Sequence, residues 1–292
     1  MAGEFTPPFH INNLTQGGLW RILSLALQEV RRLIRIGIRS DLEFIPEAAR
    51  LGCDYLELPL SRIQALSDAE FAELAEYLDA LGLRAEVMHD MLPASVRVTG
   101  PDVQARVQHA YLDSAFARAK RLGAEVIAFD AAKARQVPAG FDFPLARRQA
   151  GNFLRIAQGH AAVTGLRLAV QNLRTAECNL INTVSEAALM AALLQLDNVG
   201  VLADTVQMAF AAEPLDAVER CCGALEHVHA GCALTRRLPR EGDGEDYAAL
   251  FRALARMGYA GRVGAVAAEP FSTKDAEAAL ACLRSAREAS LT

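Results

Sequence analysis

Short apolar runs alternate with amphipathic segments along most of this chain. Each run is nearly continuous in apolar residues, which is typical of strands buried on both faces of a parallel sheet. Eight such strands are predicted, over residues 33–38, 53–58, 83–88, 125–129, 166–170, 199–203, 225–229 and 262–268.

A segment with helical spacing of apolar residues follows each predicted strand. The helices are expected over residues 42–51, 67–81, 101–122, 143–163, from 183 onward, 214–222, 247–257 and 272–289. Capping boxes mark two of the starts, Ser67 with Glu70 and Thr183 with Glu186. Strands that alternate with helices indicate parallel α/β structure.

Eight strand–helix units over residues 33–292 predict a single-domain (β/α)8 TIM barrel of the α/β class, which needs about 250 residues. A doubly wound sheet is the alternative fold. It is disfavoured because the segment GIRSDLEF, at the end of the first strand, lacks a Gly-rich phosphate-binding turn.

Residues 1–32 form an extension ahead of the predicted barrel. Leu19, Leu23 and Leu27 lie at helical spacing, so an amphipathic helix is one interpretation and a start-site artefact is the other. Charged residues interrupt the apolar stretch 18–36 and exclude a membrane span there. A signal peptide is not expected, since no small-residue cleavage site follows.

The composition argues against several classes of partner. The chain has 292 residues and a net charge of −5, with no cluster of basic residues that would favour nucleic acid. Its six cysteines form no CxxC pair, so reduced thiols and a cytoplasmic location are expected. We expect neither a nucleic-acid partner nor a membrane.

Polar residues stand where the predicted strands end, and in a barrel these ends converge on one face. They are Glu57, His89, Asp130, Gln171, Asp204, His229 and Glu269. Carboxylates with imidazole suit Mn, Zn or Fe, and carboxylates also suit Mg. Other interpretations stay open: Asp204 as a helix cap, Glu57 as an internal salt-bridge partner, and His227 as a core histidine.

Three arginines lie on loops that follow predicted strands: Arg135, Arg236 and Arg237. Such guanidinium groups could hold a phosphate or a hydroxyl-rich substrate. A solvated loop is the simpler interpretation of each.

Several stretches carry a family resemblance: LGCDYLELPLS (51–61), HDMLPASVRVTGP (89–101), KARQVPAGFD (133–142), ECNLINTVSEA (177–187), VLADTVQM (201–208), HVHAG (227–231) and FRALARMGYAGRV (251–263). With them the chain resembles the xylose isomerase-like TIM barrels, the sugar phosphate isomerase/epimerase superfamily, over about residues 33–285. The resemblance implies one divalent metal ion, held by Glu, Asp, His and Glu at the ends of strands five to eight. The two Glu side chains also move protons beside a carbonyl.

This sequence departs from that pattern. Gln171 replaces the Glu of strand five, whereas Asp204 and His229 keep the next two ligands. Gln207 stands where a His is usual, and Cys232 where an acid is usual. Strand eight has two alignments. Without a gap Val266 takes the ligand position, whereas Glu269 takes it only with extra residues and a bulge, because alternation turns it away from 264 and 266.

The resemblance implies a set of roles for particular residues. Asp204, His229 and Glu269 would bind the metal, with Mn expected and Mg, Zn or Co as alternatives. Catalytic roles would fall to Glu57, His89, Gln171, Glu177 and Glu269, and substrate contacts to Arg135, Asn179, Gln207 and Arg237.

The function expected from these residues is that of an enzyme, a sugar isomerase or epimerase. It would act on a small ketose, keto-inositol or related polyol by metal-assisted proton transfer beside a carbonyl. The alternatives are a dehydratase or lyase, which can run with one base, and a non-catalytic barrel that binds a ligand. A DNA-repair endonuclease fits least, because the chain has six His and an acidic balance. A homodimer is expected by resemblance only.

Overall fold

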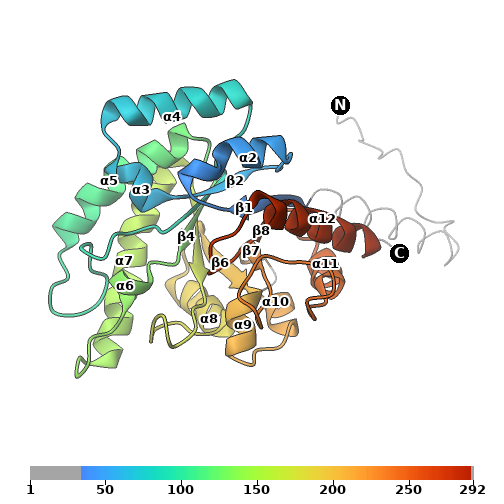
Figure 1. The fold of residues 1–292 in the computed structure, drawn as a ribbon. Helices are drawn as coiled ribbons and strands as arrows, with labels where there is room; N and C mark the ends of the chain where they lie inside the picture. Colours follow the sequence, from blue (N-terminus) through green and yellow to red (C-terminus); the bar gives the residue numbers. More distant parts are fainter. Residues whose placement is uncertain (1–33, 222, 291–292) are drawn as a thin grey trace, which may run out of the picture.

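Parallel strands in chain order close into a barrel in the computed structural model, which describes residues 34–221 and 223–290 (Figure 1). The strands are β1 (Arg35–Arg39), β2 (Leu56–Pro59), β3 (Val87–His89), β4 (Val126–Phe129), β5 (Arg167–Gln171), β6 (Val199–Asp204), β7 (Leu225–Ala230) and β8 (Arg262–Ala265). β8 pairs with β1 and completes the ring. The predicted (β/α)8 barrel is therefore confirmed.

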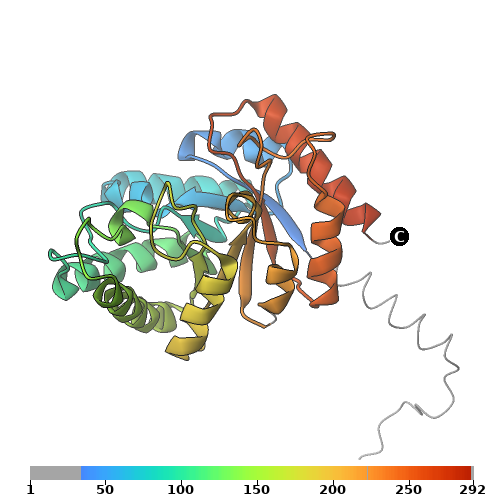
Figure 2. The same ribbon diagram turned by 90° about the horizontal axis from the view of Figure 1, so that it is seen from below.

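Helices lie around the outside of the strands (Figure 2). They are α2 (Ile45–Arg50, after the 3-10 turn η2, Leu42–Phe44), α3 (Leu60–Ala65), α4 (Asp68–Leu81), α5 (Ala105–Arg121), α6 (Ala132–Arg135), α7 (Phe143–Thr164), α8 (Val184–Leu194), α9 (Thr205–Phe210), α10 (Asp216–Arg220), α11 (Tyr247–Arg256) and α12 (Thr273–Ala289). The Ser67–Glu70 capping box is present. Thr183 caps α8, but the Glu186 carboxylate accepts from the backbone N–H of Asn182, so only half of the second box forms.

The structure differs from the prediction mainly where the chain turns. β8 ends at Ala265 and not at 268, because Ala268 N–H donates to Arg236 in the β7–α11 loop and no longer to a strand. The short helices α3, α6 and α9 are absent from the prediction. They have only four to six residues, too few to show a 3.6-residue period.

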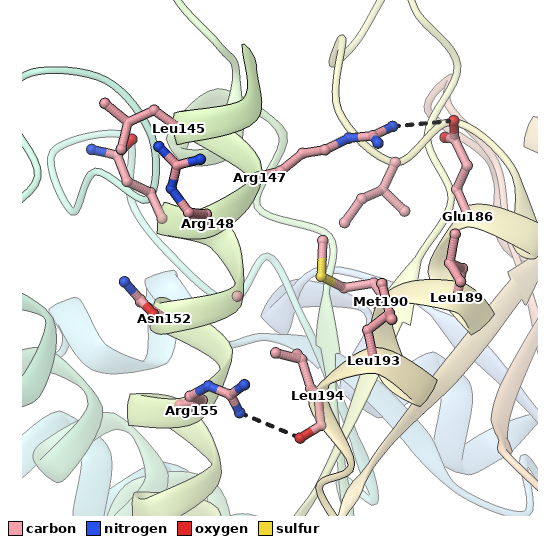
Figure 3. A pocket seen from close by; sticks show the side chains of 13 residues that line it. Leu145, Arg147, Arg148, Asn152, Arg155, Glu186, Leu189, Met190, Leu193 and Leu194 are labelled. Carbon is pink, nitrogen blue, oxygen red and sulfur yellow. Dashed lines mark hydrogen bonds and ion pairs between the residues drawn. The ribbon is translucent and has the colours of Figure 1, made fainter. Parts of the chain in front are cut away.

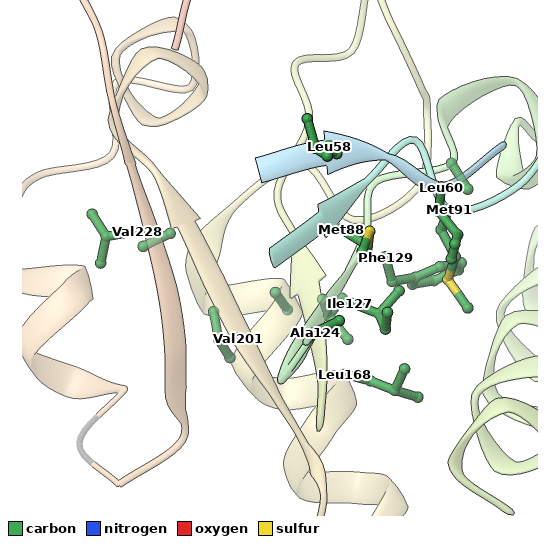
Figure 4. Packing of buried hydrophobic residues seen from close by; sticks show 14 of the residues in the cluster. Leu58, Leu60, Met88, Met91, Ala124, Ile127, Phe129, Leu168, Val201 and Val228 are labelled. Carbon is green, nitrogen blue, oxygen red and sulfur yellow. The ribbon is translucent and has the colours of Figure 1, made fainter. Parts of the chain in front are cut away.

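Alternation along the strands divides the buried side chains into two groups. One group packs between the strands and the helices. Figure 4 shows Met88, Ile127 and Phe129 of this group. The other is a small apolar cluster of Tyr55, Val87, Val126, Ala128, Ala169 and Leu202 inside the barrel. Burial of each large apolar side chain stabilises the fold by roughly 1.5–3 kcal/mol.

Two glycines leave one side of the barrel interior to Tyr55, which precedes β2, and to Glu57 of β2. A Cβ at Gly37 would lie 2.6 Å from Tyr55 Cζ. A Cβ at Gly264 would lie 2.9 Å from Glu57 Oε2. The ring of Tyr55 and the carboxylate of Glu57 therefore occupy the space that side chains of β1 and β8 would otherwise fill.

Three further predictions concern the amino-terminal extension, membrane-spanning helices and the cysteines. The extension at 1–32 lies outside the described residues. Within the described ranges, no helix has the length and apolarity that a bilayer crossing needs. Cys53, Cys178, Cys221, Cys232 and Cys282 are free thiols there, as predicted.

Candidate functional site

Four polar side chains meet at the carboxyl end of the barrel and form one hydrogen-bonded chain. Glu57 Oε1 lies 2.8 Å from His229 Nε2, and Glu57 Oε2 lies 3.0 Å from His227 Nε2. His229 Nδ1 lies 3.3 Å from Asp204 Oδ2. We call Asp204, His229, Glu57 and His227 the buried relay. All four are almost completely buried.

The carboxylates of the relay decide its protonation. Burial lowers the pKa of His229, but Glu57 and Asp204 outweigh burial and raise this pKa to about 9. Burial raises the pKa of Glu57, but the two imidazoles hold it well below its usual value. Burial lowers the pKa of His227. At neutral pH, His229 is therefore an imidazolium between two carboxylates, and His227 is neutral.

The carboxylate of Asp204 accepts hydrogen bonds from two residues besides its contact with His229. Its Oδ1 accepts from Gln207 N–H at 3.1 Å and caps α9, so the cap interpretation is confirmed. Its Oδ2 accepts from Gln171 Nε2 at 2.9 Å. Gln171 Oε1 is buried and has no hydrogen-bond partner in the described part of the chain.

His89 lies at the end of β3 in a different environment. Its Nε2 lies 3.3 Å from the carbonyl oxygen of Ser40, which can only accept, so Nε2 carries the proton. Nδ1 is then a bare lone pair, buried and unpartnered among the described residues. Burial and the nearby Arg39 guanidinium lower the pKa of His89 to about 4, which keeps the ring neutral.

Asp130 organises the loop that follows β3. Its carboxylate accepts from the backbone N–H groups of Asp90 (2.7 Å), Met91 (3.1 Å) and Ala131 (2.8 Å). Arg39 Nη2 lies 3.6 Å from the same carboxylate. These contacts give Asp130 a structural role at the barrel mouth.

Glu177 joins the loops that follow β5 and β7. Its carboxylate accepts from Arg174 Nε at 2.8 Å and from Gln207 Nε2 at 3.2 Å, and Arg236 Nη2 lies 3.6 Å away. Gln207 also accepts from Arg174 N–H through Oε1. Two predicted residues, Glu177 and Gln207, therefore lie together near the end of β6. Arg236, one of the three arginines on the predicted strand-end loops, joins them.

Three predicted residues lie apart from this centre. Arg135 is fully buried and donates to the carbonyls of Phe129 and Gln171, so its guanidinium is held by backbone acceptors. Asn179 exchanges hydrogen bonds with the backbone of Val137. Arg237 is exposed and lines a pocket between the β7–α11 loop and the segment that joins β8 to α12.

The end of β8 presents Val266, and not Glu269, to the barrel interior. Gly264 faces Glu57, and alternation places Val266 on the same side, where it is 5% exposed. Glu269 lies beyond the strand, exposed, in the same pocket as Arg237. The bulge that would turn Glu269 inward is not formed, because β8 ends at Ala265.

The four family positions do not fit the metal that the resemblance implies. They hold Gln171, Asp204, His229 and Val266, which is one carboxylate, one imidazole, one neutral amide and one aliphatic side chain. The affinity of such a site depends on its count of charged ligands. Both imidazole nitrogens of His229 already face carboxylates. The ligand atoms of Glu57, His227 and His229 do lie within 4.8 Å of one another, so this different trio could hold a metal ion.

Gly264 was not singled out from the sequence. The interpretation of His227 as a core histidine is confirmed, because its imidazole is fully buried and lies 3.0 Å from Glu57 Oε2. Glu57 is confirmed as an internal salt-bridge partner. Alternation along one strand places His227 and His229 on the same face.

The groove between α7 and α8 is a different kind of surface (Figure 3). Leu189, Met190 and Leu193 line one wall and Arg147 and Arg155 the other. Glu186 is the sole carboxylate among its described lining residues, so the groove offers no acid–base pair. The side chains that could act as acid and base are therefore those at the strand ends.

Comparisons agree with this fold. The family model described as xylose isomerase-like TIM barrel matches residues 45–286. No curated protein matches the sequence. Among solved structures, the chain is similar to a D-psicose 3-epimerase from Clostridium cellulolyticum H10, with 21% identity, a TM-score of 0.76, and coverage of 88% of this chain and 99% of that one.

Two further structures extend the comparison. A 3-keto-D-glucoside 4-epimerase from E. coli has 18% identity and a TM-score of 0.73, with 86% of this chain and 99% of that one covered. An AP endonuclease, family 2, from Brucella melitensis has 20% identity and a TM-score of 0.69, with 85% and 97% covered. At these identities the neighbours show the fold, and the family model shows the membership. The chain belongs to the xylose isomerase-like TIM barrel family.

Proposed function

We propose that this protein is a sugar isomerase or epimerase that acts on a small ketose, keto-inositol or related polyol at the carboxyl end of the barrel. The reaction would be proton transfer at the carbon next to a carbonyl. Family membership and the epimerase neighbours support the substrate class. The residues at the strand ends support the type of reaction.

The observation that carries this proposal is the bare Nδ1 of His89. A neutral imidazole with its tautomer fixed by a backbone carbonyl needs no prior deprotonation to accept a proton, although its pKa of about 4 makes it a weaker base than an ordinary histidine. Gln171 Oε1 also lacks a partner among the described residues and can accept from a substrate hydroxyl. One group takes a proton, and the other orients a polyol.

A dehydratase or lyase is the second candidate, favoured by the loss of one base. An epimerase needs an acid–base group on each face of the reacting carbon, and Gln171 cannot be one. Removal of an α-proton followed by loss of a β-hydroxyl needs a single base. His89 alone would supply it.

Solvent deuterium separates these reactions. The protein would be incubated in D2O with ketohexoses, ketopentoses and inososes, and the products followed by NMR and mass spectrometry. We expect deuterium at the carbon next to the carbonyl, lost by about 100-fold or more in His89→Gln. His109→Gln, an exposed histidine on α5, is the matched control.

The same experiment distinguishes the alternatives. Loss of a water mass with deuterium uptake would identify the dehydratase. A ligand that raises the melting temperature without any exchange would identify a binding barrel, and the proposal of catalysis would then be wrong.

A further inference from the structure

We propose that hydrogen bonds among its own side chains, and not a divalent metal ion, hold the strand-end centre of this barrel together. This inference concerns the free protein and does not rest on the proposed reaction. It starts from the family positions, where Val266 offers no ligand atom and Gln171 offers no charge.

Hydrogen bonds satisfy the contacts between the imidazoles and carboxylates of the buried relay without a metal ion. Two imidazole nitrogens of His229 face two carboxylates, Glu57 at 2.8 Å and Asp204 at 3.3 Å. A proton on each nitrogen satisfies both contacts. A third hydrogen bond runs from His227 Nε2–H to Glu57 Oε2, at 3.0 Å. Each of these N–H groups then has a charged acceptor, which is the stronger class of hydrogen bond.

Both carboxylate oxygens of Asp204 accept hydrogen bonds in the same network. Its Oδ2 accepts from Gln171 as well as from His229, and its Oδ1 accepts from Gln207 N–H. The Gln171 amide donates where the family Glu would bring a second negative charge. Gln171 thus stabilises the ionised Asp204 by a hydrogen bond, without adding the charge that would attract a cation.

A metal ion bound by Glu57, His227 and His229 would also leave a buried hydrogen-bond donor unsatisfied. A metal-bound histidine usually donates its other ring N–H to an acceptor. His227 Nδ1 is buried without a partner among the described residues. With a metal on Nε2, Nδ1 would be an unsatisfied buried donor, which costs about 1–3 kcal/mol. With the proton on Nε2, Nδ1 is only an unused lone pair.

Metal binding to the chelator-treated protein tests this inference. Calorimetric titrations with Mn²⁺ and with Zn²⁺ should show no saturable one-to-one binding up to millimolar concentration. The double variant Gln171→Glu/Val266→Glu restores carboxylates at both family positions and should show saturable one-to-one Mn²⁺ binding, at least about tenfold tighter than the millimolar limit of the wild-type titration. Gln104→Glu/Val163→Glu adds the same charge at two exposed positions, the N-cap of α5 and α7, and should not.

Two calorimetric results would overturn the inference. One is saturable binding by the wild type that is lost in Asp204→Asn or in His227→Gln. The other is a double variant that keeps the wild-type circular dichroism and still fails to bind, because the missing carboxylates would then not be the reason.

NMR of the wild type tests the inference independently if the double variant does not fold. In ¹⁵N-histidine NMR of the wild type at pH 7.5, one imidazole should carry protons on both nitrogens, and this signal should disappear in His229→Asn. A spectrum in which every histidine is singly protonated at this pH would overturn the inference.

Discussion

A single missing methyl group makes room for the buried relay. Because a Cβ at Gly264 would lie 2.9 Å from Glu57 Oε2 and 3.4 Å from His227 Nε2, Gly264→Ala should displace the carboxylate. We expect a loss of about 1–3 kcal/mol in the free energy of unfolding, measured with urea. Gly159→Ala in α7, where nothing lies within 4 Å, should be neutral or stabilising. Equal effects of the two changes would contradict this account.

The protonation of His229 makes stability depend on pH. Its pKa is about 9 in the folded protein and near 6.5 in the unfolded chain, and it faces Glu57, Asp204 and His227. A raised folded pKa stabilises fully below pH 6.5, and this contribution fades as the pH rises through 9. The free-energy difference between wild type and His229→Gln should therefore shrink by about 3 kcal/mol between pH 6.5 and pH 10. Urea denaturation across this range checks it; a constant difference would exclude a charged His229.

For single residues, the sequence predicts which side chains lie at the strand ends but not which hydrogen bonds they form. The convergence of Glu57, Asp204 and His229 follows from strand-end positions alone. The inward turn of Val266 does not, because it depends on where β8 stops, and a backbone contact from Ala268 to the β7–α11 loop decides that. Arg135 was placed on a surface loop for a similar reason. Only the fold shows the carbonyls that its guanidinium binds inside the protein.

At the scale of elements, Asp204 belongs both to the relay and to the start of α9. Asn is as good an N-cap as Asp, whereas Ala is a poor one. Asp204→Asn should keep the cap and remove the charge that faces His229, and Asp204→Ala should lose both. We expect Asp204→Ala to be less stable than Asp204→Asn by about 1 kcal/mol in urea denaturation at pH 7. In His229 NMR titrations, both variants should show a lower imidazole pKa than the wild type, since both lack the carboxylate. Equal stability of the two variants would mean that the cap contributes nothing.

Long, strongly periodic elements are the ones that the sequence predicts well. α4 and α7 were expected at 67–81 and 143–163 and run over Asp68–Leu81 and Phe143–Thr164. By contrast, α3, α6 and α9 begin within three residues of a strand end and are too short for a period to emerge. α9 nevertheless positions part of the site, through the cap and through Gln207. The segments that carry function are therefore those in which the local pattern is weakest.

On the scale of the whole molecule, the two ends of the barrel have different charge networks. Arg262 at the start of β8 donates to Glu86 at 2.5 Å and also to Glu125, and Arg35 of β1 joins Glu86. Arg262 and Glu86 are almost completely buried at the amino-terminal end, away from the relay. In TIM barrels that end serves stability, and chemistry is confined to the other.

A pair of matched substitutions tests this division. Arg262→Gln leaves Glu86 with Arg35 as its remaining guanidinium partner, and the loss of a buried hydrogen bond between charged groups costs about 1.5–3 kcal/mol. Arg256→Gln breaks an exposed pair with Glu219 and should cost about 1 kcal/mol or less. Well below its lowered melting temperature, folded Arg262→Gln should still exchange deuterium at the wild-type rate, because the buried relay and His89 lie at the opposite end of the strands. Loss of exchange in a variant that remains folded would mean that the two ends are coupled through the barrel interior, and that the amino-terminal network also shapes the site.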